Sequence, residues 1–106
     1  WGYTPLETGA LGVASVTTDL AGFGRYIEKE SQNNEIPGIF VLKRLNRKEE
    51  DIVSDLALMM YTFSEYSKQD RIECKLKAKR LASLADWKIL VENYVKAHNL
   101  AIDKIR

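Results

Sequence analysis

The chain has 106 residues, of which 45% are hydrophobic and 29% are charged, and its formal net charge is +1. This composition is typical of a globular protein and gives no overall reason to expect nucleic acid or an anionic membrane as a partner. One cysteine and one histidine exclude an internal disulfide and a zinc site built from these residue types. No apolar run is long enough for a transmembrane helix, so we expect a cytoplasmic protein.

The first recognisable pattern is a helix start at residues 4–7. Thr4 suits the N-cap position, Pro5 suits the first helical position, and Glu7 would complete a capping box. Gly12 predicts the end of this short helix. Free N–H groups and the helix dipole favour an anion at such a start, which makes it a candidate phosphate site.

Two short apolar segments predict a βαβ unit. Residues 13–18 are small and β-branched, residues 23–31 suit a helix that ends in polar residues 32–34, and residues 39–42 read as a second buried strand. A helix between two strands predicts that the strands are parallel. The uncharged first strand is expected to be central, with both sheet faces covered.

The second half of the chain predicts three helices, over residues 48–66, residues 68–84, and a last helix that Asp86 would cap. The apolar residues of the first of them predict contacts on two sides, and the apolar face of the last includes His98. The fold class is therefore α/β, with about two parallel strands and mostly helices, ending in long C-terminal helices. Either the sheet has more strands than these, or further strands precede Trp1.

Signature residues at both ends of the chain carry a family resemblance. Residues 1–5 (WGYTP) with Glu7, followed by SVTT at 15–18 and GFG at 22–24, resemble glycogen synthases of the animal and fungal type, glycosyltransferase family 3. Residues 80–88 and 94–97 resemble the C-terminal helices of that family. The middle of the chain matches only in pattern.

This resemblance implies a GT-B enzyme with two Rossmann-like halves and an active site between them. Residues 1–46 would form the donor-site βαβ portion of the C-terminal half, and residues 47–106 its helical portion. Such enzymes transfer glucose from UDP-glucose to the 4-hydroxyl of an α-1,4-glucan, with retention and without a metal or other cofactor. We expect a homo-oligomeric full-length enzyme and a fragment that is inactive by itself, because the other catalytic groups lie elsewhere.

The resemblance also assigns residues to the donor site. Gly2, Tyr3 and Thr4 match the segment that receives the donor's diphosphate. Glu7 matches the second of two glutamates eight positions apart, which hydrogen-bonds the ribose. The alternative for Glu7 is a purely structural role in the capping box, and Trp1 is more typical of packing than of ligand contact.

The helix over residues 68–84 is strongly basic, because residues 68–80 contain six Lys or Arg residues and only two acidic residues. Lys68, Arg71, Lys75 and Lys79 recur at helical spacing, so they share one face. Such a face can be merely solvated, or it can bind phosphate.

In the family that this chain resembles, the corresponding helix carries an arginine cluster that senses glucose 6-phosphate. Here only Arg71 and Arg80 are arginines at aligned positions, whereas Lys75 and Lys77 are lysines, which lack the bidentate fork. The candidate effector residues are therefore Arg71, Lys75 and Arg80.

Two other functions compete with this interpretation. One is a non-catalytic helical module for interaction or regulation, in which the Thr4 segment only caps a helix. The other is a related GT-B transferase that forms sucrose or trehalose. Nucleic-acid binding by the basic helix is disfavoured, because no aromatic residue between Tyr66 and Trp87 could stack on bases.

Overall fold

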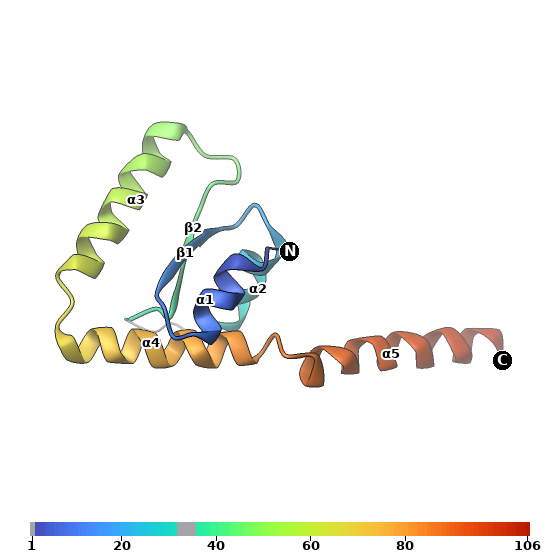
Figure 1. Ribbon diagram of the computed structural model, residues 1–106. Coiled ribbons are helices and arrows are strands. Elements are labelled where there is room, and N and C mark those ends of the chain that lie inside the picture. Colours follow the sequence, from blue (N-terminus) through green and yellow to red (C-terminus); the bar gives the residue numbers. More distant parts are fainter. Residues whose placement is uncertain (1, 32–35) are drawn as a thin grey trace.

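The computed structural model describes residues 2–31 and 36–106, so the predictions about Trp1 and residues 32–34 lie outside the described part. The elements in chain order are α1 (Thr4–Ala10), β1 (Ser15–Thr18), α2 (Gly22–Glu30), β2 (Ile39–Leu42), α3 (Glu49–Ser64), α4 (Lys68–Ser83) and α5 (Trp87–Ile105). The mixed α/β class is thus confirmed, with helices over most of the chain (Figure 1).

The two strands pair in parallel, as the βαβ pattern predicted. Ser15 lies opposite Ile39 and Thr18 opposite Leu42, and no other strand joins this sheet in the described residues. The first strand is shorter than the predicted 13–18. It is also not covered on both faces within this chain, since Val16 is 45% exposed.

The core lies on one face of the sheet, where alternate residues of β2 meet three helices. Ile39 and Val41 face this core, while Phe40 and Leu42 point to the side of α3. The buried core residues are Phe23, Ile27, Ile39, Ala78, Leu81 and Ala85.

Glycines let the backbone segments of this core come close together. A Cβ added to Gly24 would lie 1.9 Å from the Thr18 carbonyl oxygen, and one added to Gly38 would lie 2.4 Å from the Ala78 nitrogen. Either contact is far inside van der Waals distance. The first turn of α2 therefore packs directly on the end of β1, and the residue before β2 packs directly on α4.

The helix starts differ from one another in their caps. Ser67 and Asp70 form a capping box on α4, and the Asp86 side chain accepts a hydrogen bond from the Lys88 N–H at 2.8 Å. The prediction that Thr4 is an N-cap is wrong, because Tyr3 holds that position and no side chain caps α1. The predicted stop at Gly12 is confirmed, since Gly12 has φ +70 and a Schellman motif closes the helix.

Helices α3 and α5 contribute no buried residue, although both carry many apolar side chains. Figure 1 shows α3 standing away from the strands and α5 extending beyond the rest of the molecule. The side chains expected to give α3 a second contact side, such as Val53, Leu58 and Tyr61, are exposed, so that expectation is wrong for this chain, although the end of α3 does contact β2 and α4. His98, on the apolar face of α5, is exposed as well. No described helix is long and apolar enough to cross a membrane.

Candidate functional site

The start of α1 lies toward the carboxyl edge of the parallel sheet. Gly9, near the end of α1, packs against Ile39 at the beginning of β2, because a Cβ there would lie 3.3 Å from the Ile39 side chain. Figure 1 shows α1 running back alongside β1, so that its first residues point toward the end of that strand. In open α/β sheets, ligands bind outside the carboxyl ends of the strands.

All four residues predicted for this segment are exposed and come together at the start of α1. Gly2 has φ +91 and open space where a Cβ would stand, so a ligand can approach the backbone there. Tyr3 is 68% exposed, and Thr4 opens the helix without capping it. Glu7 uses its N–H to bond the Tyr3 carbonyl at 2.8 Å.

The carboxylate of Glu7 makes no capping hydrogen bond at the helix start. The capping box predicted for it does not form, and among the described residues no hydrogen bond or ion pair involves this carboxylate. Of the two roles that the sequence left open for Glu7, the structural one is therefore wrong. A free, exposed carboxylate can accept hydrogen bonds from hydroxyl groups of a ligand.

A buried aspartate, which sequence reasoning missed, ties the ends of the two strands together at the same edge. Asp19 follows β1, is 8% exposed, and its Oδ1 accepts hydrogen bonds from the N–H groups of Arg44 (2.7 Å) and Leu45 (3.1 Å). These bonds, the Arg44 one foremost, lower the pKa of the Asp19 carboxyl from its ordinary value of 3.8. The signal available in the sequence was an acidic residue directly after a strand.

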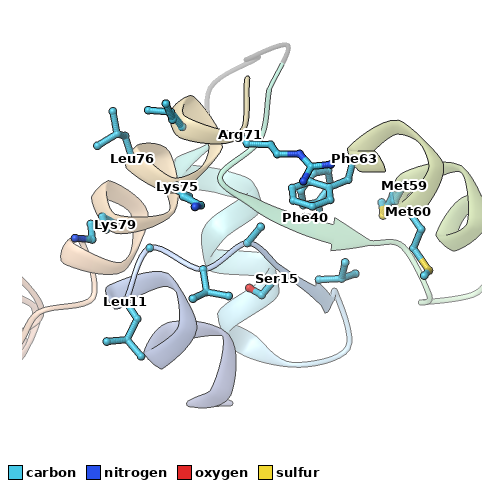
Figure 2. A pocket seen from close by; sticks show the side chains of 15 residues that line it. Leu11, Ser15, Phe40, Met59, Met60, Phe63, Arg71, Lys75, Leu76 and Lys79 are labelled. Carbon is cyan, nitrogen blue, oxygen red and sulfur yellow. The ribbon is translucent and has the colours of Figure 1, made fainter. Parts of the chain in front are cut away.

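A second candidate site is a groove between the sheet, α3 and α4, here called the basic groove. Its floor is apolar, and three cations of α4 stand along one wall (Figure 2). The lining residues are Leu11 to Val16, Phe40, Met59, Met60, Phe63, Arg71, Ile72, Lys75, Leu76 and Lys79.

The structure places only some of the predicted effector residues in the basic groove. Arg71 and Lys75 line the basic groove, but Arg80 does not, and Lys79 takes the third place. Helical spacing explains this result, since positions 71, 75 and 79 follow one another on one face, whereas position 80 is rotated away. Lys77 is engaged elsewhere, donating to the Ile36 carbonyl at 2.9 Å and pairing with Glu73 at 2.6 Å.

The three groove cations differ in their contacts. Lys75 and Lys79 have no ion-pair partner among the described residues. The Arg71 guanidinium instead lies over the Phe63 ring, 5.3 Å from its centroid, and donates to the Ser64 carbonyl at 3.4 Å. The groove also contains Ser15, whose buried hydroxyl oxygen has no hydrogen-bond partner in the described residues.

Comparisons with known proteins identify relatives over the whole chain. A family model described as glycogen synthase matches residues 1–106. The chain is 40% identical over 102 residues to a glycogen [starch] synthase of Neurospora crassa, 35% over 105 residues to one of Caenorhabditis elegans, and 34% over 104 residues to the liver form of Mus musculus. These matches cover 96%, 99% and 98% of this chain but only 14%, 16% and 15% of the respective relatives.

Proposed function

Because the chain belongs to the glycogen synthase family, we propose that the full-length protein transfers glucose from UDP-glucose to the 4-hydroxyl of an α-1,4-glucan, with retention of configuration. Residues 1–46 supply part of the donor site, and residues 47–106 form the helical part of the same Rossmann-like domain. The full-length enzyme is a cytoplasmic homo-oligomer. The family match over residues 1–106 is the observation that carries this proposal.

The Gly2–Glu7 segment is the part of the donor site that this chain contributes. The backbone at Gly2 and Tyr3 and the hydroxyl of Thr4 contact the diphosphate, and Glu7 accepts a hydrogen bond from a ribose hydroxyl. Three features of the structure support these roles: the position at the carboxyl edge, the open space around Gly2, and the free Glu7 carboxylate.

The donor site is tested by titrating UDP into the full-length protein. A variant with Glu7→Ala and Thr4→Val should bind UDP roughly tenfold or more weakly, because hydrogen bonds to charged groups are worth about 1.5–3 kcal/mol. The matched control is Glu92→Ala, which removes an exposed carboxylate from α5. Equal UDP affinity in the variant and the wild type would favour the non-catalytic helical module.

Two separate assays test which acceptor the full-length protein uses and whether the isolated segment is active. The full-length protein should elongate glycogen but form neither sucrose when it is offered fructose nor trehalose 6-phosphate when it is offered glucose 6-phosphate. The 106-residue chain alone should transfer no glucose from UDP-glucose. Glucosyl transfer by this purified segment would contradict the assignment of the remaining catalytic groups to other parts of the enzyme.

The native assembly is tested by sedimentation. The full-length protein should sediment as a homo-oligomer, and a monomer at micromolar concentration would contradict that part of the proposal. The isolated segment should self-associate, since its two-stranded sheet leaves an unpaired strand edge within the described residues. A stable monomeric segment would argue against this expectation.

The basic groove supports a second function, the binding of a phosphorylated effector through Arg71 and Lys75. The observation that favours it is the unpaired state of Lys75 and Lys79 along one wall. Lysines bind phosphate as point charges, so we expect salt-sensitive binding. The sequence-based choice of Arg80 for the same role is not supported by its position.

The effector function is tested by measuring glucose 6-phosphate affinity in the full-length protein. Lys75→Ala with Lys79→Ala should weaken binding roughly tenfold. The control, Lys96→Ala with Lys104→Ala, removes two exposed cations from α5 and should leave the affinity unchanged. A response of the control equal to that of the double variant would show that only net charge matters.

A further inference from the structure

We infer that Arg71 couples the occupancy of the basic groove to the attachment of α3. The inference rests on the effector function proposed for this groove and specifies how that function is regulated. In the structure, the Arg71 guanidinium holds α3 by stacking on Phe63. An anion in the groove competes with Phe63 for the same guanidinium.

The C-terminal half of α3 is attached to the sheet chiefly through one aromatic cluster. The Phe63 ring meets Phe40 of β2 edge-to-face, with centroids 6.1 Å apart, and meets Tyr66 at 5.5 Å. No residue of α3 is buried, so the helix has little other packing to fix its position. The position of this half of α3 therefore depends on contacts made by Phe63.

Arg71 adds a contact from α4 to this cluster. Its guanidinium lies 5.3 Å from the Phe63 centroid, and Nη2 donates to the carbonyl of Ser64, the last residue of α3. Figure 2 shows Arg71 extended toward Phe63, while Lys75 and Lys79 stand on successive turns farther along α4. In this conformation the Arg71 guanidinium contacts α3, although Arg71 also lines the groove.

An anion bound near Lys75 attracts the guanidinium away from Phe63, because a charge-assisted hydrogen bond exceeds an exposed cation–π contact in strength. The end of α3 then loses one of its few contacts. Because the ring and the anion compete for one guanidinium, a change at Phe63 that weakens the Arg71–Phe63 contact must strengthen anion binding correspondingly.

The test uses the full-length protein and inorganic phosphate as the probe. Hydrogen exchange is followed at the amides in the C-terminal half of α3. Arg71→Gln should raise their exchange roughly two- to fivefold without any anion, the range expected from an exposed cation–π contact. Arg80→Gln removes a cation of the same helix outside the groove and should leave that exchange unchanged.

Two further measurements test the competition itself. Phosphate should raise the exchange of the same amides in the wild type but not in Arg71→Gln. Phe63→Leu, which keeps an apolar side chain and removes the ring, should bind phosphate roughly two- to fivefold more tightly than the wild type.

Each failure has a distinct meaning. Unchanged α3 exchange in Arg71→Gln would overturn the role of Arg71 in attaching α3. Phosphate affinity that is equal in Phe63→Leu and the wild type would overturn the competition. Absence of phosphate binding in every variant would refute the effector function and with it the coupling, while the anion-free exchange of Arg71→Gln still decides whether Arg71 holds α3.

Discussion

Helices α4 and α5 show that apolar composition does not decide which helix is buried. The first 13 residues of α4 include six Lys or Arg, yet Cys74, Ala78, Leu81 and Ala82 of this helix are buried. Helix α5 carries a Trp, a Tyr and several Ile, Leu and Val residues, yet none of its residues is buried. Burial of α4 comes from its small residues, which allow close approach of Gly9 and Gly38.

This chain therefore contains two kinds of apolar surface. The apolar surface around α4 is covered by other parts of the chain and forms the core of the molecule. The surface of α5 is left open apart from Leu90, which packs against the core, so the stability of the chain depends little on the rest of this helix. Substitutions of the same type in the two helices should therefore have very different effects.

The largest difference is expected for a matched pair of leucines. Leu81 is 5% exposed in the core, whereas Leu100 of α5 is 63% exposed. Leu81→Ala should lower the free energy of unfolding by roughly 2–5 kcal/mol, because it removes buried methyl groups and leaves a cavity. Leu100→Ala should change it by less than about 0.5 kcal/mol. Denaturant titrations of the 106-residue chain measure both, and equal losses would mean that Leu100 contributes as much to stability as Leu81.

The next effect concerns the close approach of α4 to the sheet. Gly38→Ala places a Cβ 2.4 Å from the Ala78 nitrogen and 2.5 Å from the Lys77 carbonyl carbon, so backbone must move. We expect destabilisation of about 1–3 kcal/mol, the usual range for overpacking. A thermal unfolding scan checks this, and a Gly38→Ala chain as stable as the wild type would show that α4 is not pressed on β2.

Removing the N-cap of α4 should affect the unfolding of the whole chain, whereas removing the N-cap of α5 should affect only local opening of that helix. Ser67→Ala removes the capping box of α4 and should lower the global free energy of unfolding by about 1 kcal/mol. Asp86→Ala removes the cap of α5, whose helix carries no buried residue, so it should raise hydrogen exchange in the first turns of α5 only. A global loss in both variants would mean that α5 unfolds together with the core.

The smallest expected effect is a pH dependence of the free energy of unfolding, which comes from Cys74 of α4. Burial raises the pKa of this thiol above its ordinary value of 9.0. A raised folded-state pKa contributes stability that is fully present below pH 9.0 and is lost as the pH rises through the folded-state value. The unfolding free energy of the wild type should therefore fall more steeply above pH 9.0 than that of Cys74→Ala. Parallel pH profiles would contradict the burial of the thiol.

Local features of the fold were predictable because they depend on neighbouring residues. Asp86 caps α5 and Gly12 ends α1 as their positions in the sequence indicated. Thr4 is the exception: its pattern suited a cap, but the backbone of Tyr3 is already helical, with φ −89 and ψ −27, so Thr4 lies one position too late to cap.

Contacts between distant residues were not predictable in the same way. The hydrogen bonds from Arg44 and Leu45 to Asp19 cross more than 20 residues of sequence, and so does the packing of Gly38 on Ala78. The basic groove itself was not predicted, since helical spacing put Lys68, Arg71, Lys75 and Lys79 on one face but could not show that three of these four residues line a groove.

The α/β class, the parallel βαβ unit and the family follow from the sequence alone, because they depend on residue periodicity, local turn chemistry and a long specific string of residues. The free carboxylate of Glu7, the place of Lys79 rather than Arg80 in the groove, and the contact of Arg71 with Phe63 are visible only in the folded chain. Each of these depends on where a side chain lies relative to another element, and that relation is established by packing between elements far apart in the chain.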